Sequence, residues 1–423
     1  MKVLLIGGGG RESALAWAIR RSPLVTTLLA APGNPGIARH ARCVPVGIDD
    51  PGGIVELAAS ERVDLTVVGP EAPLVAGLAD HLEAAGHVVF GPSAAAARIE
   101  GSKAFAKDLM ARHGVPTARF ATFTAPAAAR AYARELGAPC VVKTDGLAAG
   151  KGAIVCATLE EADAAIALCL ERAEFGDAGR TVVVEEFMRG EEASFFAIVS
   201  GADVLPLTAA QDHKTVFDGD RGPNTGGMGA FSPVTSFDPA TEQRVMDAIV
   251  RPVAAALAAE GAPYHGVLYV GLMLTSEGPK VVEFNCRFGD PECQVLMVRL
   301  AEDLVPVLHA VARRAPLPPR VKWSDDAAVC VNVASGGYPG RYATGLPITG
   351  VEDAERTGAL VFHAGTAEVD GRLVTAGGRV LSVTGAGATL PDALRRVYGA
   401  IAAITFEGMH YRRDIGTRPT APR

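Results

Sequence analysis

The sequence lacks the marks of several large protein classes. No apolar stretch approaches the roughly 18 uncharged residues of a membrane-spanning helix, so no membrane partner is predicted. The 40 Lys and Arg residues are outnumbered by 47 Asp and Glu residues, and the net charge of −7 argues against a nucleic-acid-coating protein. The amino-terminal MKVLLIGGGGRESALAW has neither a long apolar core nor a small-residue cleavage site, so no secretory signal peptide is predicted.

Cysteine is scarce and follows no pattern. The seven cysteines are odd in number, and none stands in C-x-x-C spacing. Most lie in apolar, strand-like text such as Pro139-Cys140-Val141-Val142. This usage predicts buried, reduced thiols and a cytoplasmic protein, rather than a disulfide framework or a metal cluster.

Apolar residues are plentiful. They make up 49% of the 423 residues, which is enough to fill several cores, and the length predicts about two to four domains of ~150 residues each. The negative net charge does not exclude binding of small anionic substrates, because a few local Arg and Lys side chains and backbone amides can hold a phosphate.

The first hundred residues alternate short apolar strands with helices. Lys2–Ile6 and Asp64–Val68 read as strands, and Arg11–Arg20 reads as a helix. These apolar strands are too short to show an alternation of apolar and polar residues, and helices separate them. This pattern predicts a parallel sheet covered on both faces. The glycine loop 7–10 follows a strand end, at the edge of the sheet where ligands bind in such folds.

Two further units follow, one before and one after a proline-rich stretch at 313–320. In the first of them, the glycine-rich loop 145–152 joins two predicted strands. A long helix is expected over Gln243–Glu260, with a core-facing stripe at four-residue spacing and a kink at Pro252. The proline-rich stretch 313–320 is the clearest linker, and more strands and a closing helix follow it.

The glycine loop before the first helix favours a sugar phosphate over a dinucleotide. Glu12 stands where the dinucleotide fingerprint requires glycine, and the second strand carries no acid for a ribose. We expect Gly9, Gly10, Arg11 and Glu12 to bind a sugar phosphate at the helix N-terminus. A tight turn needed only for packing is the alternative.

The loop Asp145–Gly152 resembles a Walker A loop but departs from it. The glycine spacing is one residue short, and Gly152 replaces the magnesium-binding Ser or Thr. A glycine loop between two strands, with Lys143 and Lys151 beside it, predicts a lid that closes over nucleotide phosphates. A plain hairpin does not account for Lys143, which is costly to bury unless an anion meets it.

Acidic residues are concentrated in two places. Four carboxylates lie between Glu185 and Glu192, which indicates either a solvated loop or a hinge that holds adenine and ribose. In the second place, strand alternation puts Glu283, Asn285 and Arg287 on one face. Two oxygen ligands beside a guanidinium suit Mg²⁺ bridging phosphates, and the alternative is an amphipathic edge strand.

Together, these motifs resemble those of the phosphoribosylamine–glycine ligase (glycinamide ribonucleotide synthetase) family of ATP-grasp enzymes, nearly from end to end. The motifs are VGPEAPL at 68–74, EGSKAFAKD at 100–108, KTDGLAAGKG at 143–152, EEFMRGEEASF at 185–195, QDHK at 211–214, GPNTGGMGAFSP at 222–233, EFNCRFGDPE at 283–292, GGYPG at 336–340 and RRDIG at 412–416.

The resemblance implies an α/β fold with an ATP-grasp core. A biotin-carboxylase-like, Rossmann-like amino-terminal domain over 1–100 would bind the sugar phosphate. The ATP-grasp domain would span 101–322, with a lid subdomain over about 119–189. A small α+β domain over 323–423 would pack back on the first.

The family's residue roles carry over onto matching positions. Around ATP, they imply Lys103, Lys143, Gly146, Gly150, Lys151 and Gly152 at the phosphates, Glu185, Glu186, Phe187 and Met188 at the adenine, and Glu192 at the ribose. Glu283 and Asn285 would hold Mg²⁺ or Mn²⁺. Arg287 would neutralise an acyl phosphate, and Asp212, Asn224, Thr225, Gly226 and Asp290 would hold the amine and the glycine.

The resemblance implies ATP-dependent ligation of glycine to 5-phosphoribosylamine in purine synthesis, with transient contact to the amidotransferase that supplies the amine. The chain departs from the family pattern at Gly8, Ser13, Cys293 and Thr417. Three alternatives stay open: another ATP-grasp carboxylate–amine ligase, a dinucleotide oxidoreductase, and a non-catalytic nucleotide sensor. A sensor would be expected to have lost Lys151, Glu283 or Arg287.

Overall fold

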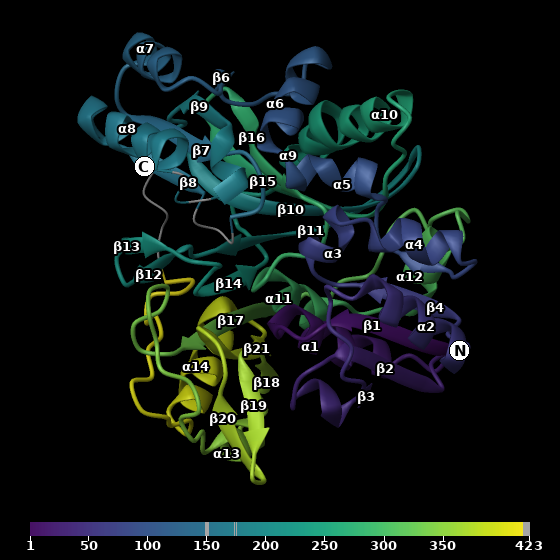
Figure 1. Cartoon of the computed structure of the whole chain (residues 1–423). Coiled ribbons are helices and arrows are strands. Elements are labelled where there is room, and N and C mark those ends of the chain that lie inside the picture. The colour runs from purple at the N-terminus through teal and green to yellow at the C-terminus, as the bar shows by residue number, and fades with distance from the viewer. Residues whose placement is uncertain (149–151, 173, 175, 418–423) are drawn as a thin grey trace.

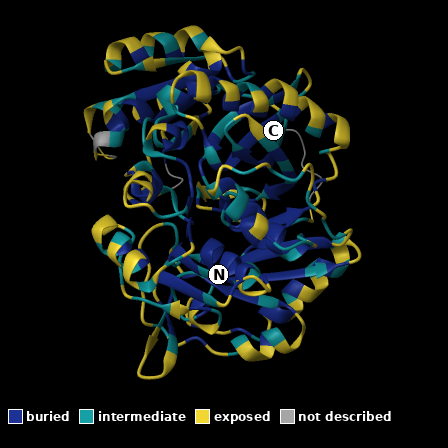
Figure 2. Ribbon diagram, turned by 90° about the vertical axis from the view of Figure 1, so that its right-hand side faces the viewer, coloured by how far each residue is buried: buried dark blue, intermediate teal, exposed yellow. Residues whose placement is uncertain are grey.

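The computed structural model describes residues 1–148, 152–172, 174 and 176–417. Figure 1 shows the amino-terminal elements in purple at the lower right and the carboxyl-terminal elements in yellow at the lower left, with the middle of the chain above both. The strands form the dark, buried interior in Figure 2, and the outward faces of the helices are exposed. No helix in the described ranges is long and apolar enough to cross a bilayer.

The amino-terminal part is the predicted parallel sheet, in the order β3-β2-β1-β4-β5. The middle strand β1 is buried from Val3 to Ile6, so apolar residues fill both of its faces. The elements are β1 Lys2–Gly7, α1 Gly10–Arg20, β2 Thr27–Pro32, β3 Arg42–Cys43, α2 Pro51–Glu61, β4 Leu65–Val68, α3 Glu71–Val75, α4 Leu78–Ala84, β5 Val89–Phe90 and α5 Ala94–Gly101.

A four-stranded antiparallel sheet, in the order β6-β9-β7-β8, forms a separate layer at the top of Figure 1. Its core is built largely from small residues, including Ala129, Ala133, Ala162 and Ala165 on two packed helices. The elements are α6 Lys103–Arg112, β6 Phe120–Phe123, α7 Pro126–Leu136, β7 Cys140–Thr144, β8 Ala153–Cys156, α8 Leu159–Ile166 and β9 Val182–Glu186. All seven cysteines of the chain are free, and six are buried, as predicted.

An eight-stranded sheet connects the middle of the chain to its carboxyl-terminal part. Its order is β16-β15-β10-β11-β14-β17-β21-β18, and its paired strands are antiparallel. It comprises β10 Glu191–Ser200, β11 Asp203–Asp212, β14 Gly229–Ser232, β15 His265–Thr275, β16 Gly278–Asn285, β17 Ala327–Ala334, β18 Leu360–His363 and β21 Arg379–Gly387. The sheet therefore runs unbroken across the expected boundary at 322.

Shorter elements complete the fold. Two hairpins are formed by β12 Thr215–Phe217 with β13 Arg221–Asn224, and by β19 Thr366–Val369 with β20 Arg372–Thr375. The remaining helices are α9 Pro239–Val245, α10 Arg251–Ala259, α11 Glu292–Arg299, α12 Val305–Ala312, α13 Val351–Arg356 and α14 Leu390–Ile401. The predicted linker 313–320 contains neither helix nor strand.

The long helix expected over 243–260 is interrupted earlier than predicted. A π-helical turn over Met246–Val250 separates α9 from α10, and Pro252 lies in the first turn of α10. Proline has no N–H to donate, so the hydrogen-bond pattern changes in the turn before it. The apolar stripe of Val245, Ile249, Val253 and Leu257 is fully buried, as predicted.

The carboxyl-terminal motif RRDIG fastens the β12–β13 hairpin. Arg412 is fully buried. Its Nε donates to Asp414 Oδ1 at 2.7 Å, its Nη2 donates to Asp220 Oδ1 at 3.0 Å, and its Nη1 donates to Thr215 O at 3.1 Å. One guanidinium therefore satisfies two carboxylates and a main-chain carbonyl.

We predict that Arg412→Met lowers stability by about 3–5 kcal/mol, because it leaves Asp220 and Asp414 without their buried counter-charge. Chemical denaturation followed by circular dichroism measures the effect. Arg395→Met is the matched control, because Arg395 pairs with Asp392 on the exposed side of α14. An unchanged unfolding midpoint in Arg412→Met would contradict the anchoring role.

Candidate active site

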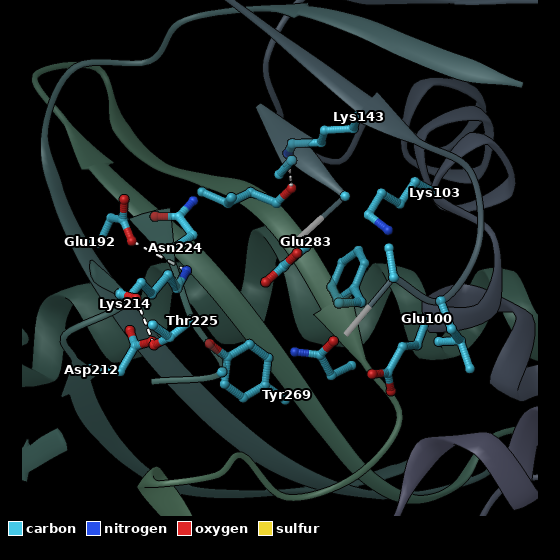
Figure 3. A pocket seen from close by; sticks show the side chains of 18 of the residues that line it. Glu100, Lys103, Lys143, Glu192, Asp212, Lys214, Asn224, Thr225, Tyr269 and Glu283 are labelled. Atoms are coloured by element: carbon cyan, nitrogen blue, oxygen red, sulfur yellow. Dashed lines mark hydrogen bonds and ion pairs between the residues drawn. The ribbon is translucent and has the colours of Figure 1, made fainter. Parts of the chain in front are cut away.

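A cavity of about 650 Å³ lies between the four-stranded sheet, the eight-stranded sheet and the carboxyl-terminal part. Figure 3 shows side chains from α5, α6, the four-stranded sheet and the eight-stranded sheet converging on it. Of the residues expected at the site, those that line the cavity are Arg11, Lys103, Lys143, Gly146, Gly152, Glu185, Glu186, Phe187, Met188, Glu192, Asp212, Asn224, Thr225, Gly226, Glu283, Asn285, Arg287 and Asp290.

The α1 terminus meets the cavity through one side chain. Arg11 lines it, whereas Gly9, Gly10 and Glu12 do not. Glu12 caps its own helix: Oε2 accepts from Gly9 N at 2.8 Å, and Oε1 pairs with Arg11 Nε at 2.5 Å. The first free amide of the helix is thus already satisfied by a carboxylate. Gly150 and Lys151 fall outside the described residues.

A buried carboxylate separates two lysines at one wall of the cavity. Glu185 forms ion pairs with both Lys143 and Lys107, and all three side chains are almost fully buried. Burial raises the pKa of Glu185, but the two lysines outweigh it and lower the pKa below its usual range. Burial also lowers the pKa of Lys107 to about 8, with partial compensation from Glu185. The negative charge that compensates buried Lys143 therefore comes from the protein itself, from Glu185. Two lysines and one glutamate leave this Lys107–Glu185–Lys143 trio with one surplus positive charge.

Glu283 occupies the middle of the cavity. Lys103, Lys143 and Lys214 surround it in Figure 3. Burial opposes its charge, but the three lysines and Arg287 lower the pKa of Glu283 below its usual value. Within the described ranges, no hydrogen bond or ion pair occupies its carboxylate oxygens. Because the charged Glu283 carboxylate has no direct partner among the described residues, a ligand can bind to it.

Asn285 lies two residues further along β16 and also lines the cavity. One terminal atom of its amide lies 3.0 Å from Glu100 Oε1 and 3.1 Å from Phe284 O. Both neighbours only accept hydrogen bonds, so this atom is the nitrogen. The amide oxygen then takes the other position, on the side that faces hydrogen-bond donors. Glu283 and Asn285 offer hard oxygen donors, which fit Mg²⁺ or Mn²⁺ completed by phosphate oxygens.

Arg287 follows the end of β16 and is held by two carboxylates. Its Nε donates to Glu71 Oε2 at 3.1 Å, and its Nη2 donates to Glu100 Oε1 at 3.0 Å. Burial opposes ionisation of Glu71, but Arg287 and Arg11 lower the pKa of Glu71 to about 2. Fixed ion pairs thus orient the guanidinium in the cavity.

A second charged group lies across the cavity, around Lys214. Its Nζ lies 3.3 Å from Glu192 Oε2. Burial raises the pKa of Asp212 to about 7, opposed by Lys214 and assisted by Glu292, Glu192 and Glu283. Asp212 is therefore close to the range in which it can exchange a proton.

The loop 224–227 is held from the carboxyl-terminal part. Gly226 N donates to Tyr338 Oη at 3.1 Å, and Arg379 Nη1 donates to Gly226 O. Arg379 also pairs with Asp290, with Nη2 at 3.1 Å from Oδ2. Tyr338 and Arg379 both line the cavity, so the last part of the chain contributes directly to the site.

Several cavity residues were not assigned a role from the sequence: Glu71, Glu100, Lys107, Lys214, Tyr269, Tyr338 and Arg379. Most of them stand inside the motifs quoted above, and this membership was the signal in the sequence that could have identified them. Their roles depend on contacts between distant segments, such as Glu100 with Arg287. The spacing of residues along the chain does not reveal such contacts.

Family models match three consecutive parts of the chain. They are the Phosphoribosylglycinamide synthetase N domain at residues 1–100, the ATP-grasp (A) domain at 101–293 and the C domain at 328–418.

Full-length relatives agree. The phosphoribosylamine–glycine ligase of Agrobacterium fabrum is 52% identical, over 100% of this chain and 99% of its own. That of Escherichia coli K12 is 51% identical, over 99% of this chain and 98% of its own.

Solved structures show the same fold. The crystal structure of phosphoribosylamine–glycine ligase from Thermotoga maritima matches with a TM-score of 0.87 and 34% identity, over 98% of this chain and 100% of that one. The biotin carboxylase domain of Hydrogenobacter thermophilus 2-oxoglutarate carboxylase matches with a TM-score of 0.74 and 17% identity, over 97% and 91%, which shows fold alone. These matches confirm the expected α/β ATP-grasp fold, and the chain belongs to the phosphoribosylamine–glycine ligase (phosphoribosylglycinamide synthetase) family.

Proposed function

We propose that this chain ligates glycine to 5-phosphoribosylamine with the conversion of ATP to ADP and phosphate, a step of purine biosynthesis. The observation that carries the proposal is Glu283, a charged carboxylate that has no direct partner among the described residues and is surrounded by three lysines in the cavity that also holds Arg287. This is the charge arrangement that a metal-bound triphosphate requires. Membership in the ligase family supports the choice of substrates.

In this proposal ATP lies between the four-stranded sheet and β16. Lys103 and Lys143 hold its phosphates, and Lys151 joins them. The surplus positive charge of the Lys107–Glu185–Lys143 trio supports a phosphate at this wall. Glu185, Glu186, Phe187 and Met188 form the adenine hinge, and Glu192 meets the ribose. Because the Glu185 carboxylate pairs with lysines, its contact to adenine is assigned to the main chain.

Glu283 and Asn285 would hold Mg²⁺ or Mn²⁺. When bound, the ion would supply positive charge that offsets the charge of the phosphates and of the transferred group. The donor chemistry of the two side chains supports this assignment.

Glycine's carboxylate attacks the γ-phosphate to give glycyl phosphate, and the sugar amine then attacks that carbonyl and releases phosphate. A carboxylate is already a nucleophile, so the chain needs positioning and charge compensation rather than a Ser or Cys nucleophile. Arg287 offsets charge on the acyl phosphate, with Lys151 assisting. Asp212 and Asp290 hold the amine and glycine beside Asn224, Thr225 and Gly226, and the closed lid excludes water.

The domain roles follow from the same arrangement. The part over 1–100 binds the sugar phosphate through Arg11 and the α1 terminus, 101–322 binds ATP with 119–189 as its lid, and 323–423 closes the substrate end through Tyr338 and Arg379. The matched family ranges support this division. A cytoplasmic location and transient delivery of the amine by an amidotransferase complete the proposal.

The direct test is ADP release with freshly generated phosphoribosylamine, omitting one substrate at a time. We expect ADP only when glycine and phosphoribosylamine are both present, and glycinamide ribonucleotide by mass spectrometry. Release with a different carboxylate or amine, and none with this pair, would assign the chain to another ATP-grasp reaction.

Glu283→Ala tests the metal assignment. We expect ADP release to fall by at least about 100-fold, because even partners of metal ligands are worth 10–100-fold. Glu277→Ala is the matched control, since Glu277 lies at the exposed turn of the same hairpin and pairs only with Lys280 there. Near-normal turnover in Glu283→Ala would refute the assignment.

Lys107→Met tests the charge balance behind Lys143. Without Lys107, Glu185 fully neutralises Lys143, so we expect roughly tenfold weaker ATP binding by calorimetry. Lys107→Arg should retain affinity, and so should Arg112→Met on the exposed side of the same helix.

The same balance predicts a pH dependence. With a pKa of about 8, Lys107 loses its charge as the pH rises through that value, and ATP affinity should fall there in the wild type more than in Lys107→Arg. Equal affinities of Lys107→Met and wild type would contradict the charge argument.

A further inference from the structure

The carboxylate of Glu100 receives hydrogen bonds from three consecutive residues at the end of β16. Glu100 lies in the last turn of α5, far from them in sequence. Its Oε2 accepts from Cys286 N at 2.7 Å. Its Oε1 accepts from Arg287 Nη2 at 3.0 Å and from the amide nitrogen of Asn285 at 3.0 Å.

We propose that Glu100 is a positioning residue that sets the geometry of two functional groups at once: it turns the amide oxygen of Asn285 toward the metal site and fixes the guanidinium of Arg287 beside it. This inference rests on the proposed function, in which Asn285 is a metal ligand. It assigns to Glu100 no contact with substrate or metal.

The amide of Asn285 has two orientations of nearly equal shape, and only one presents oxygen to a metal. A carboxylate at 3.0 Å accepts from the nitrogen and repels the oxygen, so Glu100 selects the metal-binding orientation. The same carboxylate neutralises Arg287, and its side chain is only 7% exposed, so water does not replace it readily.

Both oxygens of Glu100 are needed. A glutamine has one oxygen and one NH₂ group, so either orientation turns a donor toward at least one of the three N–H groups. If the NH₂ faces Asn285, that amide is favoured to rotate and to present nitrogen to the metal. The loss should therefore appear in metal binding itself, and not only in turnover.

The test measures Mn²⁺ affinity in the presence of a non-hydrolysable ATP analogue, from the free Mn²⁺ signal in electron paramagnetic resonance. We expect Glu100→Gln to weaken Mn²⁺ binding by about tenfold or more, the usual effect of removing a ligand's hydrogen-bond partner. Glu71→Gln is the matched control: Glu71 also binds Arg287 but has no contact with Asn285, so Mn²⁺ affinity should be retained.

Asn285→Asp gives an independent reading that leaves Glu100 in place. An aspartate would set a carboxylate against that of Glu100, so we expect weaker Mn²⁺ binding although aspartate is ordinarily the stronger ligand. Adding Glu100→Gln should restore binding, because the glutamine NH₂ can donate to the new carboxylate. Rescue by a second substitution is not expected from a merely structural role.

The proposal would be overturned by wild-type Mn²⁺ affinity in Glu100→Gln. It would also be overturned by tighter binding than wild type in Asn285→Asp with no rescue by Glu100→Gln. Equal losses in Glu100→Gln and Glu71→Gln would also overturn it, since they would reflect the Arg287 network alone. The proposed function is tested separately: if the wild type binds Mn²⁺ with nucleotide but releases no ADP with glycine and phosphoribosylamine, the ligase reaction fails and the role of Glu100 is still measured.

Discussion

The placement of buried charge governs this structure. Carboxylates and cations are brought out of water into one cavity, where each ionised group is costly unless an opposite charge compensates it. Glu185 compensates Lys143 and Lys107, and Glu71 and Glu100 compensate Arg287. Among the residues that the structure describes, Glu283 faces lysines without forming an ion pair with them. The site is thus pre-formed except at the point where a ligand is proposed.

The charged groups that compensate one another in the cavity come from every part of the fold. Arg11 and Glu71 come from the amino-terminal part, Lys103 and Lys107 from α6, Lys143 from the four-stranded sheet, Lys214 from the segment between β11 and β12, and Arg379 from the carboxyl-terminal part. The eight-stranded sheet joins β16 to the carboxyl-terminal part through the pairing of β14 with β17, and Tyr338 and Arg379 hold the loop 224–227 from that part. Such rigidity suits a reaction that depends on positioning.

The sequence predicted those features that depend on local pattern. Buried apolar strands indicated the parallel sheet, and strand alternation placed Glu283 and Asn285 together. Arg287 was expected on the same strand face, but β16 ends at Asn285, and Arg287 is instead directed by Glu71 and Glu100. Glu12 was expected at a phosphate, and the structure shows its carboxylate capping α1. Short patterns do not contain the pairings of Arg287 with distant segments, whereas the Glu12 cap is a local contact three residues along the chain.

Two of the four departures from the family pattern, Ser13 and Cys293, lie in packing contacts. Ser13 Oγ accepts from His363 N at 3.2 Å, and Cys293 Sγ lies 3.8 Å from Arg11 O, and neither residue lines the cavity. Both positions therefore act where α1 meets later segments.

A crystal structure with Mn²⁺ and a non-hydrolysable ATP analogue, with the metal located by anomalous scattering, would show directly what Glu283 binds. We expect a Mn²⁺ peak within coordination distance of Glu283 and the Asn285 amide oxygen, with the triphosphate between that peak and Lys103 and Lys143. A metal peak or triphosphate elsewhere, with Glu283 still free of ligands, would contradict this expectation.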